Sequence, residues 1–116
     1  MRTIIFYRTE SGRCPVKEFI DSLNAQQARK VVWVLQLVEE LERVPTQYFK
    51  KLVSTDDIWE VRVRTGGEIF RLLGFFDGAR LIVLNHTFSK KTRKTPAGAI
   101  ALAEIRKRDY LGRQKR

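Results

Sequence analysis

The chain has 116 residues, 43% of them hydrophobic, and its formal net charge is +10. This length predicts one domain over residues 1–116, and the composition excludes an intrinsically disordered chain. One cysteine and one histidine cannot supply an internal disulfide or a metal site, and no apolar run approaches the roughly 20 residues of a membrane helix. We therefore expect a cytoplasmic protein without metal, cofactor or membrane partner.

The first half of the chain predicts one strand and two helices. Residues 3–7 form a short apolar strand that ends at turn-forming residues. Pro15 suits the first turn of a short helix, and Asn24 is a candidate N-cap for a second helix over residues 25–43. Apolar positions recur at helical spacing along the second helix: Val31, Val34, Leu35, Val38 and Leu41. This stripe predicts a helical hairpin that covers a sheet.

The second half predicts an antiparallel meander. After a loop over residues 45–57, residues 58–64 alternate between apolar and polar side chains, which is typical of a strand. Gly66-Gly67 and Asp77-Gly78 suit two-residue hairpin turns between this strand and the next two. The predicted fold is α+β, with the order β-α-α-β-β-β-α and the meander packed against the helical hairpin.

The C-terminal part predicts a basic loop and a last helix. The loop carries four cations: Lys90, Lys91, Arg93 and Lys94. We expect a helix over residues 96–110 and a tail over residues 111–116 that frays. The loop is interpreted either as a solvated connection or, because it follows the meander directly, as a contact for a nucleic-acid backbone.

The excess positive charge lies in the second half. Residues 1–57 carry 9 Lys and Arg against 8 Asp and Glu, whereas residues 58–116 carry 14 against 5. A positive field of this kind attracts polyanions, so the distribution predicts a nucleic-acid partner. The alternative is a basic domain whose charge only maintains solubility.

The two predicted turns fix a testable register across the meander. The first turn pairs Arg62 with Arg71, and the second pairs Arg71 with Leu84 and Ile69 with His86. One face then collects five polar side chains: Glu60, Arg62, Arg64, Arg71 and His86. Three arginines suit phosphate recognition, because a guanidinium group binds phosphate through two parallel hydrogen bonds.

These residues also have structural interpretations. The face can be a solvated surface on which Glu60 bridges Arg62 and Arg71. His86 can be a hydrogen-bonded structural histidine rather than a catalyst. Phe88 can be a core residue rather than a surface for base stacking.

Several segments together resemble a known family. They are the strand Trp59-Glu60-Val61-Arg62-Val63-Arg64, the segment Ile69-Phe70-Arg71, and residues 88–96, Phe-Ser-Lys-Lys-Thr-Arg-Lys-Thr-Pro. With the element order, they resemble the RelE/ParE toxin superfamily, and the nearest branch is the phage-related HigB-like toxins of type II toxin–antitoxin modules. Residues 15–19, Pro-Val-Lys-Glu-Phe, also resemble that branch. The likeness covers nearly the whole chain and is most specific in residues 88–96.

The resemblance implies an endoribonuclease that enters the ribosomal A site and cuts mRNA there. The 2′-hydroxyl attacks the adjacent phosphate and leaves a cyclic phosphate and a 5′-hydroxyl. Such a reaction needs a base, an acid and cations around the phosphate. The resemblance assigns phosphate stabilisation to Arg71. The candidate catalytic residues are Arg71, Glu60, Lys91 and His86. The candidate RNA-binding residues are Arg62, Arg64, Lys90, Arg93, Lys94 and Phe88, and Lys91 also helps to position the RNA.

The chain departs from the best-known branch of this superfamily at Glu60, which stands where a lysine base is expected. A carboxylate with a raised pKa can itself serve as base, and it can equally orient Arg62. The identity of base and acid therefore stays open at this point.

The resemblance also implies partners. They are a cognate antitoxin, expected to be a helix-turn-helix protein, the ribosome with its mRNA, and operator DNA only through the antitoxin. The positive charge of the second half separately predicts acidic residues on this antitoxin. Two alternative functions are a ParE-like inhibitor of DNA gyrase and a non-catalytic nucleic-acid-binding relative. The arginine face favours cleavage over gyrase inhibition, because an inhibitor of gyrase needs no phosphate-binding cluster.

Overall fold

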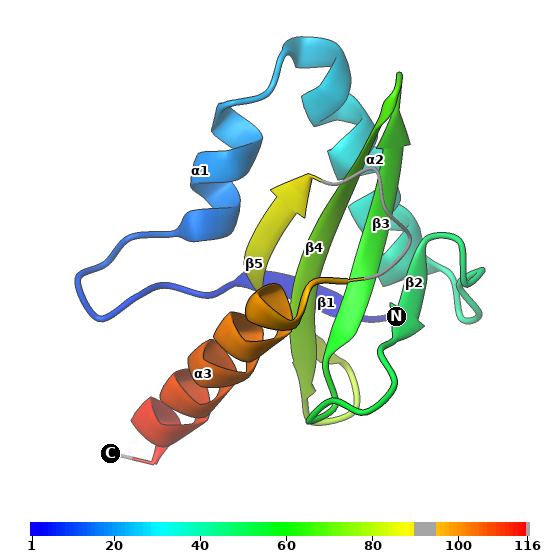
Figure 1. The fold of residues 1–116 in the computed structure, drawn as a ribbon. Helices are drawn as coiled ribbons and strands as arrows, with labels where there is room; N and C mark the ends of the chain where they lie inside the picture. The colour runs from blue at the N-terminus through cyan, green and yellow to red at the C-terminus, as the bar shows by residue number, and fades with distance from the viewer. Residues whose placement is uncertain (90–94, 116) are drawn as a thin grey trace.

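The computed structural model describes residues 1–89 and 95–115. The described chain runs through one strand, two helices, four strands and a last helix (Figure 1). They are β1 (Thr3–Phe6), α1 (Pro15–Asp21), α2 (Ala25–Glu40), β2 (Phe49–Lys51), β3 (Trp59–Thr65), β4 (Glu68–Asp77), β5 (Leu81–Ser89) and α3 (Ala97–Gln114). The α+β fold predicted from the sequence is confirmed. Within the described ranges, no helix is both long and apolar enough to cross a lipid bilayer.

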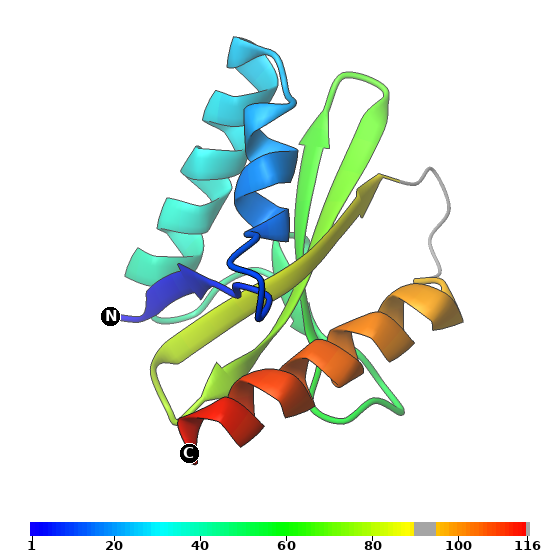
Figure 2. The ribbon, with the colours of Figure 1, turned by 90° about the vertical axis from the view of Figure 1, so that its left-hand side faces the viewer.

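The five strands form one sheet in the order β1-β5-β4-β3-β2. β1 runs parallel to β5, and the other neighbours are antiparallel. Helices α1 and α2 cover one face of the sheet and α3 crosses the other, so the molecule has three layers (Figure 2). The central strand β4 is therefore buried on both faces, with Leu72 in the cluster below α2 and Leu73 in the cluster below α3.

The helical hairpin forms as predicted, with one difference at its end. The Asn24 side chain accepts a hydrogen bond from the Gln27 backbone N–H at 2.8 Å, and Gln27 closes the reciprocal bond, so the N-cap is confirmed. Helix α2 ends at Glu40 instead of continuing to residue 43. The Arg2 guanidinium donates to the Leu41 carbonyl at 2.6 Å, which satisfies an acceptor that the helix end would otherwise expose.

A short strand lies where the sequence predicted only a loop. Residues 49–51 form β2 and pair with β3 at the sheet edge. Phe49 is buried and stacks on Trp59 with ring centroids 4.8 Å apart. The prediction of a plain loop over residues 45–57 is wrong, because this aromatic contact depends on tertiary packing and leaves no local periodicity in so short a segment.

Helix α3 is longer than predicted. The tail expected to fray from residue 111 instead stays helical to Gln114. Tyr110 packs on Phe75 of the sheet with ring centroids 5.6 Å apart, and Arg113 binds Asp109 at 2.7 Å. A contact with the sheet and an ion pair within the helix therefore stabilise the end that was expected to fray.

The register of the second hairpin, between β4 and β5, differs from the predicted one. Asp77 pairs with Leu81, so the turn is longer than the two residues expected. Arg71 faces Phe88 instead of Leu84, and His86 faces Leu73 instead of Ile69. The longer turn shifts the pairing by an odd number of residues, which alone would turn His86 to the opposite face. A bulge between Leu73 and Gly74 adds one more residue and returns His86 to the Arg71 face.

Gly74 makes this bulge possible. A Cβ atom added at Gly74 would lie 2.2 Å from the Val83 carbonyl oxygen and 2.9 Å from the Leu84 Cα. Only a residue without a side chain lets the two backbones approach this closely. Gly74 thereby fixes which side chains of β5 face α3.

Candidate functional site

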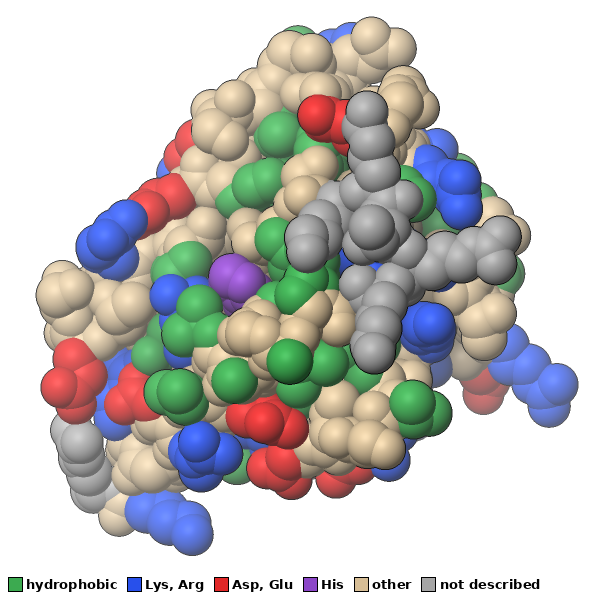
Figure 3. Space-filling view, viewed as in Figure 1, with side chains coloured by type: hydrophobic (Ala, Val, Ile, Leu, Met, Phe, Trp, Pro, Cys, Tyr) green, Lys and Arg blue, Asp and Glu red, His purple; other side chains and the backbone are tan. Residues whose placement is uncertain are grey.

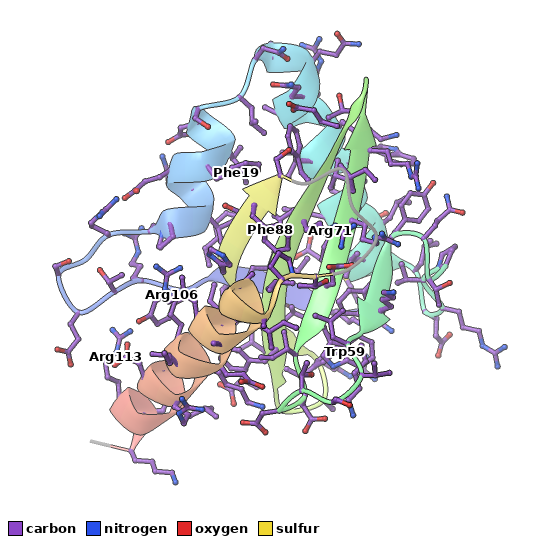
Figure 4. All side chains as sticks on the ribbon, in the orientation of Figure 1. Phe19, Trp59, Arg71, Phe88, Arg106 and Arg113 are labelled. Carbon is purple, nitrogen blue, oxygen red and sulfur yellow. The ribbon has the colours of Figure 1, made fainter. Side chains whose placement is uncertain are left out.

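The first hairpin places the candidate residues on the α3 face of the sheet. The predicted pairing of Arg62 with Arg71 is confirmed, and Thr65 pairs with Glu68 at the turn. Strict alternation along β3 directs Val61 and Val63 into the core below α2, so Glu60 and Arg62 take the opposite face. Arg71 lies on this face beside Phe88 (Figure 4).

A buried ion pair forms the centre of the site. The side chains of Arg71 and Glu60 are 0% and 1% exposed, and Arg71 Nη1 lies 3.6 Å from Glu60 Oε2. The Thr95 hydroxyl, just before α3, donates to the same Glu60 oxygen at 2.7 Å. Arg71 Nη1 in turn donates to the Thr95 hydroxyl oxygen at 3.4 Å. The three side chains therefore hold one another in a fixed arrangement.

Arg62 connects this centre to the surface. Its Nε lies 3.3 Å from Glu60 Oε1, and its side chain is 19% exposed. Glu60 thus bridges both arginines, which offsets the repulsion between like charges on neighbouring strands. The bridge agrees with the structural interpretation of Glu60, since a carboxylate held between two arginines and a hydroxyl is suited to orient them.

Arg64 lies apart from this cluster. It is exposed near the tip of the first hairpin and lines a groove beside α2. The predicted common face therefore divides in two. Glu60, Arg62 and Arg71 are in contact, whereas Arg64 serves another surface.

His86 lies on the same face as Arg71, one diagonal step across the β4–β5 pair. Such diagonal positions lie roughly 7–8 Å apart. His86 stacks on Phe88 with ring centroids 5.8 Å apart and an interplanar angle of 28°. Phe88 also packs against the cluster below α3, which agrees with its interpretation as a core residue. Figure 3 shows the histidine, in purple, at the surface and bordered by hydrophobic side chains.

Burial lowers the pKa of His86 below its ordinary 6.5, and the nearby Arg106 charge lowers it further. Both causes disfavour the imidazolium ion, so the ring is neutral at pH 7. A neutral imidazole has a nitrogen that can accept a proton, which is the property a general base needs.

We expect the imidazole resonances of His86 to titrate with a midpoint below pH 6.5. Proton NMR can measure this without assignment, because the chain has one histidine. Arg106→Gln should raise the midpoint only in part, since burial is the larger cause. Because the folded state binds a proton less readily than the unfolded chain, His86 should also reduce stability as the pH falls below 6.5. A midpoint at or above 6.5 would contradict this environment.

Two residues of the site region did not stand out in the sequence. Thr95 was part of the basic segment, yet its hydroxyl joins Glu60 to Arg71. Asn85 is fully buried and donates to the Ala103 carbonyl of α3 at 3.0 Å, while Arg106 donates to the Asn85 carbonyl at 2.7 Å. The one available signal for Asn85 was a polar residue directly after the apolar run of residues 81–84.

The basic loop falls outside the described residues. This applies to the candidate residues Lys90, Lys91, Arg93 and Lys94, which stay sequence-based predictions. Figure 3 shows acidic and basic side chains distributed around the rim of the α3 face. The site residues that the structure describes are therefore the arginine cluster, His86 and Phe88.

Comparison with protein-family models shows the family of the chain. A family model described as phage derived protein Gp49-like (DUF891) matches residues 18–108. This range includes β3, β4 and β5 and most of α3. No curated protein matches the chain.

Proposed function

The chain belongs to the phage-derived Gp49-like family, and from this we propose that it is a RelE-like toxin of a type II toxin–antitoxin module. We further propose that it belongs to the HigB-like branch and cleaves mRNA on the ribosome in the bacterial cytoplasm. The observation that carries the proposal is the joint placement of an oriented arginine pair and a neutral histidine on one face of the sheet.

The arginine pair supplies positive charge for a phosphate. In 2′-hydroxyl attack, negative charge grows on the phosphate oxygens, and donors that are already oriented stabilise it without reorganising. Glu60 and Thr95 hold Arg71 in place. Arg62, which is partly exposed, provides the guanidinium group that a phosphate meets first.

His86 is the proposed general base. Of the two candidate bases that the structure describes, Glu60 is buried in ion pairs, whereas His86 reaches the surface as a neutral imidazole. A neutral imidazole can accept a proton from the 2′-hydroxyl, and the imidazolium ion so formed can return it to the leaving oxygen. Glu60 is then a positioning residue for the arginines.

The proposed partner in the cell is an antitoxin with acidic residues. The half of the chain beyond residue 57 carries 14 basic against 5 acidic residues, so a complementary acidic surface should speed association. That rate should fall as salt rises, because salt screens exposed charges.

The mapping of RNA ends after brief induction tests the proposal. We expect new 5′-hydroxyl ends within translated codons of ribosome-bound mRNA, and no cleavage of the same mRNA without ribosomes. The inactive control is His86→Ala, and the matched active control is Arg108→Ala, which changes an exposed α3 arginine outside the cluster.

Two results would contradict this function. Intact mRNA together with gyrase-linked DNA breaks would identify a gyrase inhibitor. Intact mRNA and intact DNA, with nucleic-acid binding retained, would identify a non-catalytic relative.

A further inference from the structure

A second surface lies on the opposite side of the sheet from Arg71. The N-terminal half of α2 and the tip of the β3–β4 hairpin, which projects past the end of β5 (Figure 1), enclose an open groove of about 820 Å³. The groove is lined mainly by the outer side of α2, including Arg29, Lys30, Val32 and Trp33, and by Arg64 at the hairpin.

The outer side of α2 carries apolar side chains that do not take part in the packing of α2 against the sheet. The inner stripe of α2 is fully occupied, since Val31, Val34 and Val38 are completely buried against the sheet. Val32 and Trp33 face outward, and each is 45% exposed. Adjacent exposed apolar side chains inside a groove are typical of a protein-binding surface.

The charges around these apolar side chains have one sign. The described lining contains Arg29, Lys30 and Arg64 and no acidic residue. A partner that fits must therefore bring apolar side chains for Trp33 and carboxylates for the three cations. An amphipathic helix with an acidic polar side meets both requirements.

The surroundings of Trp33 favour a protein over a nucleic acid. Lys30 Nζ lies 4.8 Å from the centroid of the Trp33 ring and covers one of its faces. Tyr48 meets the ring in a T-shaped contact at 6.0 Å. Base stacking needs an open aromatic face, whereas Lys30 covers one face of the Trp33 ring and Tyr48 also contacts the ring.

We propose that this groove binds an acidic amphipathic helix of a partner protein. The site is separate from the proposed cleavage site, because α2 and α3 cover opposite faces of the sheet (Figure 2) and Arg71 lies on the α3 face. A partner held there leaves the α3 face open.

The probe is a synthetic helical peptide with leucines at every third and fourth position and glutamates elsewhere. Isothermal titration calorimetry gives the affinity of the peptide. The fluorescence emission of Trp33, measured in a Trp59→Phe background, shows whether the peptide binds beside Trp33. We expect binding with a blue shift of this emission, and an affinity that falls as salt rises. A scrambled peptide of the same composition should bind at least about tenfold more weakly, since it presents no apolar stripe.

Matched variants locate the binding. Trp33→Ala should weaken the affinity by about tenfold or more and Arg29→Glu by about fivefold. Two controls should stay within about twofold: Val53→Ala, an exposed apolar residue outside the groove, and Arg108→Glu, an exposed arginine on α3. Thermal melting confirms that each variant folds.

Several results would overturn the proposal. They are no binding of the amphipathic peptide, equal binding of the scrambled peptide, or equal binding by Trp33→Ala. Displacement of the Trp33 signal by single-stranded RNA alone would assign the groove to a nucleic acid. Self-association that Trp33→Ala abolishes would assign it to a second copy of the chain. Cleavage activity is not measured in this experiment, so its outcome is independent of the proposed function.

Discussion

Arg71→Ala should lower the single-turnover rate of mRNA cleavage by about 10²–10³-fold, while ribosome binding weakens only slightly. Arg71 acts on charge that develops in the transition state, so its loss affects the chemical step more than binding. Arg71→Lys should restore only part of the rate, because an ammonium group keeps the charge and lacks the guanidinium fork. The measurement is cleavage of ribosome-bound mRNA at saturating protein.

The burial of Arg71 requires a second variant to separate catalysis from stability. Removing one partner of a buried ion pair typically costs about 3–5 kcal/mol, because the other charge stays buried. Glu60 is 1% exposed, and Arg62, whose Nε lies 3.3 Å from Glu60 Oε1, is the cation that would stay beside it. A loss of activity in Arg71→Ala alone could therefore reflect unfolding.

The double variant Glu60→Leu/Arg71→Met resolves this. Apolar side chains of similar volume often replace a buried ion pair without loss of stability. We expect its melting temperature to recover most of the loss seen in Arg71→Ala, while cleavage stays absent. Cleavage near the wild-type rate in the double variant would make Arg71 a purely structural residue and would remove the proposed site.

Gly74→Ala should destabilise the fold by about 3 kcal/mol, at the upper end of the range for overpacking. The new methyl carbon would lie 2.2 Å from the Val83 carbonyl oxygen, and backbone cannot move aside as a flexible side chain does. Relief of this clash requires β4 and β5 to separate at the bulge. Urea unfolding monitored by circular dichroism measures the change.

Gly67→Ala is the matched control for this substitution. A Cβ atom at Gly67, in the turn of the first hairpin, meets no atom within 4 Å. Its effect should stay within about 0.5 kcal/mol, as for other open surface positions. Equal stability of the two alanine variants would show that the bulge does not need a glycine.

The first hairpin was predictable because its information is local. Residues 59–64 alternate strictly, and the Gly66-Gly67 turn fixes the register, so the pairing of Arg62 with Arg71 follows from the sequence. The cap at Asn24 is equally local, since donor and acceptor lie three residues apart.

The second hairpin and the burial of the site were not predictable in this way. The sequence at Asp77-Gly78 suits a two-residue turn, but the turn in the structure is longer. A bulge between Leu73 and Gly74 then places His86 on the same face of the sheet as Arg71. A bulge depends on how two strands approach each other, which no window of sequence contains. The ion pair of Glu60 with Arg71 is closed by Thr95, whose position depends on where α3 docks.

The parallel pairing of β1 with β5 has a consequence for synthesis of the protein. Thr3 pairs with Leu81, so the first strand to leave the ribosome has no strand partner until the last one emerges. At ~5–20 residues per second, translation of the intervening chain takes roughly 4–16 s. During this interval an apolar strand stays unpaired, and the contacts between Arg71 and residues near α3 have not formed. A nascent copy therefore completes its fold only after nearly all of its chain has been translated.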